Sequence, residues 1–163
     1  MGFYHTAQIC LNGHVVTNSF DKNVARRQDF CDKCGSKTIV NCTNCNATIH
    51  GNYQVEGVWN LQSTESTSPA YCYNCGNPYP WTETALESAK ILINEDENLN
   101  SDEKLLFCKT LPELIVESPT PKTQVAIVRF KKLLSKTASY TADGLRDIFI
   151  DVASETIKKS LGL

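Results

Sequence analysis

Six cysteines of this chain form three pairs with the same internal spacing, Cys31/Cys34, Cys42/Cys45 and Cys72/Cys75. Two cysteines separated by two residues can bend one tight turn around a metal ion and present both sulfur atoms to it, as in a zinc knuckle. The backbone N–H groups of such a turn point back toward the sulfurs, so the residue after the second cysteine needs a positive φ. Glycine and asparagine adopt that conformation most readily, and the residues at these places are Gly35, Asn46 and Gly76. The repeated pattern predicts zinc binding.

Six sulfurs are too few for two tetrahedral zinc sites, which need eight ligands. Cys10 and His14 are the best candidates for the missing pair, because they flank a turn predicted at Asn12-Gly13. His5 or His50 could replace His14. We therefore expect two Zn²⁺ ions and four ligand pairs, numbered first to fourth in chain order: Cys10/His14, Cys31/Cys34, Cys42/Cys45 and Cys72/Cys75.

The four pairs can combine into two sites in three ways. A nested arrangement joins the second pair to the third, a cross-braced one joins the second to the fourth, and a sequential one joins the first to the second. The seven residues between Cys34 and Cys42 are close to a common zinc-ribbon hairpin, which favours nesting. The likeness of Phe-Cys-x-x-Cys-Gly to Tyr-Cys-x-x-Cys-Gly favours cross-bracing instead. The spacing leaves all three open.

The composition changes near Trp81, since seven of the eight cysteines precede it and the long amphipathic stretches follow it. We expect an α+β protein in which residues 1–81 form a small β-rich, zinc-ribbon-like module with two zinc sites. Residues 82–163 should form a C-terminal helical module. The first module should contain short strands over 5–10 and 14–19, a strand or hairpin within 48–59 and an exposed loop over 62–69.

Helical periodicity dominates the second module. Thr84 and Glu87 have the spacing of a capping box, and Pro112 should end or kink the second helix. Cys108 falls in an apolar run of that helix and is expected to be a buried structural thiol. The expected helices cover about 82–94, 101–111, a short segment after 110, 122–136 and 142–161.

The bulk composition describes a globular protein, with 41% hydrophobic and 21% charged residues among 163. No stretch reaches the length and apolarity of a membrane span, and the N-terminus lacks the pattern of a secretory signal. We therefore expect a cytoplasmic protein. In the reducing cytosol, CxxC spacing favours metal binding over disulfides. The formal charge is −2, and seven thiolates with two Zn²⁺ would take it to about −5. A generic nucleic-acid binder usually has the opposite balance.

Charge is uneven along the helical half. Residues 82–117 carry nine acidic and three basic residues, whereas residues 118–163 carry eight basic and four acidic residues. The two stretches can pack as neighbours with complementary surfaces. Alternatively, four cations can form an anion-binding patch: Arg129, Lys131, Lys132 and Lys136.

Several longer motifs resemble a family of small, uncharacterised bacterial proteins with a domain of unknown function. The resemblance rests on Ala7-Gln-Ile-Cys-Leu-Asn-Gly-His14, on Phe30-Cys-x-x-Cys-Gly followed by a second CxxC, and on the run from Pro69 to Thr82. It continues to Ala153-Ser-Glu-Thr156 and so covers nearly the whole chain. It implies a bacterial cytoplasmic zinc protein and brings no activity with it.

Three classes of function remain. The first is a non-enzymatic adaptor or regulator with structural zinc and a protein partner, for which Tyr53, Trp59, Tyr73, Tyr79 and Trp81 are candidate contact residues. The second is nucleic-acid binding through Arg26, Arg27, Lys33 and Lys37 beside the second ligand pair. The third is a zinc or thiol-redox enzyme. Eight ligands for two ions leave a catalytic zinc no open coordination position. The glycines after the cysteine pairs and the lack of a thioredoxin-like βαβ pattern argue against a redox role. The oligomeric state is not fixed by the sequence.

Overall fold

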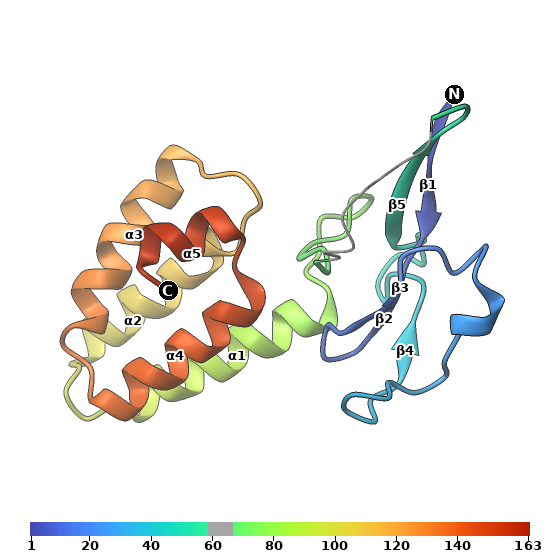
Figure 1. The fold of residues 1–163 in the computed structure, drawn as a ribbon. Helices are drawn as coiled ribbons and strands as arrows, with labels where there is room; N and C mark the ends of the chain where they lie inside the picture. The colour runs from blue at the N-terminus through green and yellow to red at the C-terminus, as the bar shows by residue number, and fades with distance from the viewer. Residues whose placement is uncertain (59–66) are drawn as a thin grey trace. The chain divides into compact units, whose positions relative to one another are not determined.

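The computed structural model describes residues 1–58 and 67–163 and has the expected α+β class, with small antiparallel sheets followed by helices (Figure 1). The chain divides into two compact units, Met1–Glu83 and Thr84–Leu163. The first unit contains the sheets and the second contains most of the helical residues. The expected loop over 62–69 falls largely outside the described residues.

A three-stranded sheet organises the ligand-bearing part of the first unit. β2 (Gln8–Cys10) lies between β3 (Val15–Thr17) and β4 (Thr38–Ile39), and both neighbours are antiparallel to it. The hairpin predicted across Asn12-Gly13 is therefore confirmed by the β2–β3 pairing. Gly13 has φ +87°, and a Cβ added to it would lie 3.0 Å from the Cβ of Trp81. Glycine is thus required at this turn both for its backbone conformation and for space.

A second, two-stranded sheet pairs the N-terminus with the segment after the third ligand pair. β1 (Gly2–Thr6) runs antiparallel to β5 (His50–Val55), and the register shifts between Tyr4 and Thr6. The strand predicted within 48–59 is β5, and Trp59 lies outside the described residues. A short 3-10 helix, η1 (Val24–Arg26), lies in the connection that leads to the second ligand pair.

The core of the first unit is small and contains cysteines. Ala7, Ile9 and Ile49 are fully buried beside Cys42 and Cys72, and the stacked rings of Tyr79 and Trp81 complete the cluster. The Trp81 Nε1–H donates to the Pro69 carbonyl oxygen at 2.8 Å. A core of this size buries little apolar area, so cross-links such as metal ions are expected to contribute much of the stability.

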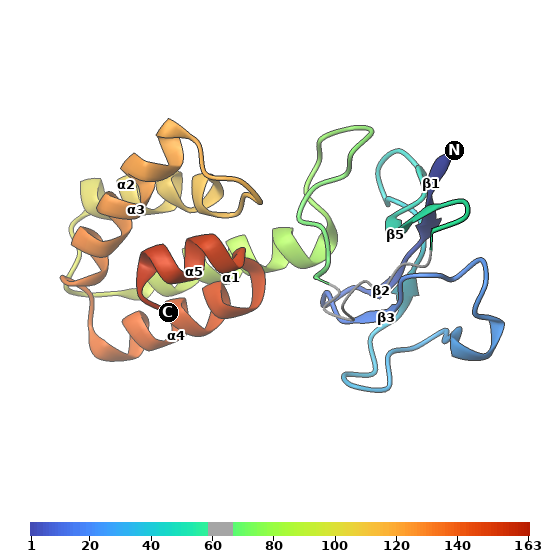
Figure 2. The same cartoon turned by 45° about the horizontal axis from the view of Figure 1, so that its top comes forward.

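The second unit is a helical bundle (Figure 2). Phe107, Phe130 and Phe149 come from three helices and make successive edge-to-face contacts, with ring centroids 5.4 and 5.0 Å apart. A Cβ added to Gly144 would lie 2.9 Å from Leu92, so this glycine permits close packing of two helices. The described helices are α1 (Pro80–Glu95), α2 (Ser101–Thr110), the 3-10 helix η2 (Leu111–Leu114), α3 (Pro121–Leu134), α4 (Ser139–Val152) and α5 (Glu155–Leu161).

Three details of the helices differ from expectation. The single helix expected over 142–161 is two helices, because the backbone is extended at Ala153 and Ser154. α1 starts at Pro80, so the predicted Thr84/Glu87 capping box lies inside it. Capping boxes occur instead at Asn100/Glu103 and Thr120/Thr123. None of the helices in the described residues is long and apolar enough to cross a membrane.

The charges of the helical unit are partly matched. Lys136, after α3, pairs with Glu103 of α2, which supports complementary packing of the acidic and basic stretches. Arg129, Lys131 and Lys132 are exposed and make no ion pair with any described residue. The expected anion patch therefore loses one of its four cations to an internal pair.

Candidate metal centres

The three CxxC turns share one backbone conformation. In each, the amide four residues after the first cysteine donates to that cysteine's carbonyl oxygen, and the first cysteine's own amide donates to the carbonyl oxygen five residues on. The predicted positive φ is confirmed at the residue after each second cysteine: +71° at Gly35, +62° at Asn46 and +72° at Gly76. Short β-bridges close the three hairpins: Phe30 to Lys37, Asn41 to Thr48, and Tyr71 to Pro78.

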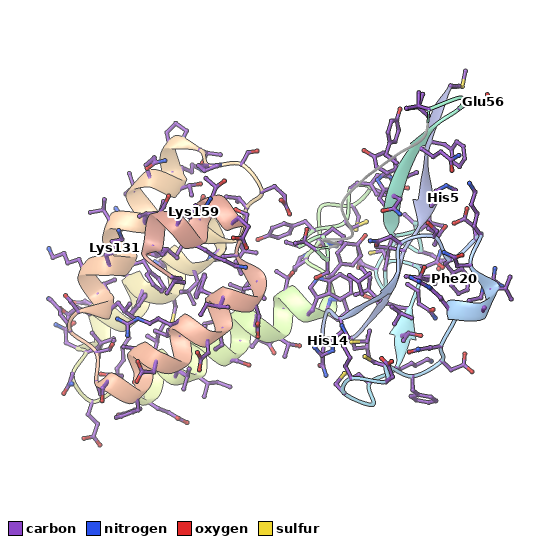
Figure 3. All side chains as sticks on the ribbon, viewed as in Figure 1. His5, His14, Phe20, Glu56, Lys131 and Lys159 are labelled. Carbon is purple, nitrogen blue, oxygen red and sulfur yellow. The ribbon has the colours of Figure 1, made fainter. Side chains whose placement is uncertain are left out.

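The first and second ligand pairs converge on one point, which we call the mixed cluster (Cys10, His14, Cys31 and Cys34). Their four ligand atoms all lie within 4.8 Å of one another. The Cys10 Sγ is 3.5 Å from the His14 Nδ1 and 3.8 Å from the Cys34 Sγ, and the Cys31 Sγ is 3.7 Å from the same nitrogen. The labelled His14 lies among sulfur atoms in Figure 3.

The third and fourth pairs form a second group, the all-cysteine cluster (Cys42, Cys45, Cys72 and Cys75). The Cys42 and Cys75 sulfurs are 3.8 Å apart, and those of Cys45 and Cys72 are 3.7 Å apart. In both clusters the first cysteine of each pair is buried, and the second is exposed or partly exposed. Each cluster thus lies at the edge of the unit with two ligands toward its interior.

These separations match the edges of a metal-centred tetrahedron. Bonds of about 2.3 Å to sulfur and about 2.0 Å to nitrogen predict edges of about 3.8 Å between sulfurs and about 3.5 Å between sulfur and nitrogen. The measured separations are 3.5–3.8 Å. All eight cysteines are free, and a disulfide needs about 2.05 Å. The two clusters could therefore hold two metal ions.

The arrangement is sequential, so neither the seven-residue spacing nor the likeness of the two cysteine motifs indicated the correct combination. β2 pairs with β4 in a register that sets Cys10 opposite Thr38, and the Leu11 amide donates to the Lys37 carbonyl oxygen. This register places the turn of the first pair against the hairpin of the second pair. The seven-residue gap after Cys34 instead contains β4 and leads to a different cluster. Pairing between strands, which is a long-range property, decided the combination.

Asparagine side chains donate to the sulfurs across each cluster, and the predicted set of site residues did not include them. The Asn44 Nδ2 lies 3.6 Å from the Cys75 Sγ, and the Asn74 Nδ2 lies 3.5 Å from the Cys45 Sγ, so each of these turns donates to the opposite one. Asn12 does the same for Cys34 at 3.4 Å. The signal was available, because asparagine directly precedes the second cysteine in two of the pairs. N–H donors of this kind stabilise thiolates and orient metal ligands.

The thiols differ in acidity. The backbone N–H of Ser36, followed by the Asn12 side chain, lowers the pKa of Cys34 to about 6. The backbone N–H of Asn77 and then the Asn44 amide lower the pKa of Cys75. Burial raises the pKa of Cys10. Donors aimed at Cys34 and Cys75 therefore favour the thiolate form, which is the form that binds metals.

The two alternative histidines make other contacts. The buried His5 places its Nδ1 2.5 Å from an Asp21 carboxylate oxygen and its Nε2 2.7 Å from the Gln54 Oε1. His50 is stacked between Tyr4 and Tyr73, with ring centroids 4.1 and 3.8 Å away, and burial lowers its pKa. Among the described residues, His14 is the histidine that joins a cysteine cluster.

The remaining candidates divide by burial. Cys108 is half-buried, not fully buried as expected, and burial raises its pKa. In the same apolar run Leu111 is buried, whereas Leu105 and Leu106 are exposed. Tyr79 and Trp81 are core residues, whereas Tyr73 remains 58% exposed. Tyr73 is thus a better candidate for contact with a partner than the two core aromatic residues.

A family model matches residues 3–161, and it is described as an uncharacterized protein conserved in bacteria (DUF2321). The chain belongs to this family. The match spans both units and therefore includes both clusters of this DUF2321 protein. No curated protein and no solved structure matched the chain.

Proposed function

We propose that this protein is a non-enzymatic adaptor or regulator of the bacterial cytoplasm, in which two structural zinc ions stabilise the first unit and protein–protein contacts carry the function. The supporting observation is that each cluster brings together four thiolate or imidazole ligands within 4.8 Å of one another. A catalytic zinc usually has three protein ligands and one open position. Closed sites instead stabilise a fold.

Zinc is the metal proposed because three thiolates with an imidazole, or four thiolates, are the ligand sets of structural zinc sites. Iron also binds four thiolates, so the identity needs a direct measurement. With zinc, the all-cysteine cluster carries a charge of about −2 and the mixed cluster about −1. The amide donors from Asn12, Asn44 and Asn74 partly offset this charge.

Nucleic-acid binding is the weaker candidate. The first unit holds five basic and five acidic residues before residue 82, and two zinc–thiolate centres would make it more negative. Binding to phosphates normally requires a basic surface and depends steeply on salt.

A thiol-redox enzyme is also disfavoured, since metal ligation would occupy the CxxC thiols.

The test is native mass spectrometry of protein purified under reducing conditions, with elemental analysis. Wild type should carry two zinc ions, and the Cys10→Ser/His14→Ala double variant should carry one. One metal ion in both proteins would remove the first pair from the ligand set and reopen the enzyme hypothesis. Affinity capture with the two-zinc protein from a bacterial lysate should recover a specific partner, and recovery of none at any salt concentration would contradict the adaptor role.

A further inference from the structure

A groove beside β4 lies next to the hairpin that carries Cys31 and Cys34. Its volume is about 600 Å³, and its lining includes Phe20, Phe30, Ile39, Arg27, Lys37 and Asp29. This volume is within the range of sites that take a small organic group or a few side chains, rather than a bare ion. All of the lining residues belong to the first unit.

The apolar residues of the groove remain partly accessible to solvent. Phe30 is 65% exposed, although it pairs through its backbone with Lys37 across the hairpin. Ile39 and Phe20 are half-buried in the same groove. Exposed aromatic side chains next to half-buried apolar residues are typical of positions that anchor a partner's side chain.

Arg27 is oriented before any ligand arrives. Its Nε donates to the Phe20 carbonyl oxygen at 2.9 Å, and its guanidinium carbon lies 4.3 Å from the centre of the Phe20 ring. These contacts hold the planar group by its inner edge, and none of the described residues accepts a hydrogen bond from its terminal amino groups. A guanidinium held in this way can donate two parallel hydrogen bonds to a carboxylate.

The charged side chains that line the groove carry a net charge of +1. Arg27 and Lys37 are exposed and make no ion pair with any residue the structure describes, and Asp29 is the acidic residue in the lining. The groove therefore suits an anion that also has an apolar body. Two cations with one opposing acid are too few for the multiple phosphate contacts of a nucleic acid.

We propose that this groove binds an acidic peptide segment of a partner protein, in which an aromatic or branched apolar side chain lies beside an aspartate or glutamate. The carboxylate would pair with Arg27 and Lys37, and the apolar side chain would pack on Phe30 and Ile39. This inference rests on the proposed adaptor function, because the mixed cluster closes the hairpin that positions Phe30 and Lys37.

The probe is a fluorescein-labelled peptide, acetyl-Asp-Phe-Asp-Leu-Asp, compared with a peptide in which asparagine replaces each aspartate. Binding to the intact two-zinc protein is measured by anisotropy, and the site is located from amide chemical shifts of ¹⁵N-labelled protein. Arg27→Gln and Lys37→Gln should each weaken binding about fivefold, whereas Asp29→Asn should tighten it, because a repulsive charge is removed. Lys33→Gln is the matched control, since this exposed cation of the same hairpin does not line the groove.

Equal weakening by Lys33→Gln and Arg27→Gln, or equal affinity for the asparagine peptide, would overturn the proposal as non-specific attraction. Absence of peptide binding at about 1 mM would also overturn it. A deoxythymidine 15-mer that binds wild type and loses affinity in Arg27→Gln would replace the peptide with nucleic acid. Wild-type protein that is purified without zinc would contradict the proposed function itself. Protein that carries two zinc ions but does not bind the peptide would contradict this inference alone.

Discussion

Asparagine donors are the residue-scale feature that most directly connects this sequence with metal binding. Asn44 and Asn74 occupy equivalent positions in two turns, and each donates to a sulfur of the opposite turn. A thiolate that accepts such a bond is less basic and better oriented, and loss of comparable partners costs about 10- to 100-fold in metal affinity. These amides therefore support the ligand set without belonging to it.

Replacing Asn44 with alanine should lower the zinc affinity of the all-cysteine cluster about tenfold, because the Cys75 thiolate loses a donor. Competition with a chromophoric chelator measures this affinity. Thr43→Ala is the matched control, since Thr43 is an exposed neighbour in the same turn. Equal affinities in the two variants would show that the amide–sulfur contact has no energetic weight.

Asp96 is the second residue with a specific electrostatic role. Its carboxylate is fully buried and accepts hydrogen bonds from the backbone N–H groups of Asn98 and Ala138, both at 2.9 Å. Burial alone would raise its pKa, but the donors that surround it lower the pKa below the usual aspartate value. Ala138 is the N-cap residue of α4, so Asp96 accepts from the N–H that a side chain at N3 accepts from in a capping box.

The lowered pKa predicts a pH dependence of stability. A carboxyl with a depressed folded-state pKa stabilises the protein above its unfolded pKa of about 3.9, and this contribution is lost as the pH falls through the folded value. Asp96→Ala should reduce the free energy of unfolding at pH 7 by about 1–2 kcal/mol, because two partly buried N–H groups lose a charged acceptor. The difference between wild type and variant, measured by urea denaturation, should shrink between about pH 5 and pH 2. A difference that stays constant over this range would contradict the assigned charge.

At the scale of elements, the turns were predictable and their partners were not. Positive φ at Gly35, Asn46 and Gly76 follows from local spacing, as does the Asn12-Gly13 hairpin. The combination of ligand pairs depends on the antiparallel pairing of β2 with β4, and a two-residue strand has almost no sequence signal. The break between α4 and α5 was also missed, because helical periodicity persists across it, as the buried Leu145, Phe149 and Ile157 show.

The turn at Gly13 gives an element-scale prediction. Gly13→Ala should destabilise the first unit by about 1–2 kcal/mol through the positive φ, and further through contact with Trp81 at 3.0 Å. Gly57→Ala is the control, because Gly57 has φ +79° and open space around its missing Cβ. The two variants share the backbone term, so the difference in their thermal midpoints isolates packing against Trp81. Equal midpoints would mean that the tryptophan moves aside at no cost.

At the scale of the whole molecule, the two units depend on different sources of stability. The first has short strands and a small core that includes Cys42 and Cys72, whereas the second buries a continuous set of large apolar side chains from α2 to α5. Hydrophobic burial at about 25 cal/mol per Å² can stabilise a bundle without metal, but a small metal domain often requires its ion to fold. The module boundary between residues 81 and 82 remains a prediction, and independent folding of the two modules would test it.

Removal of metal should therefore unfold one unit and spare the other. A chelator with a reducing agent should collapse the amide dispersion of residues 1–83 in ¹⁵N spectra, while most of the helical circular dichroism at 222 nm persists. A fragment of residues 84–163 that retains the helical ellipticity of these residues in the full-length protein would show that the bundle folds by itself. Restored dispersion after addition of two equivalents of Zn²⁺ would identify the ion as the missing component. If the helical signal disappeared together with the metal, the bundle would depend on the first unit, and stability would have to be assigned to the chain as one cooperative system.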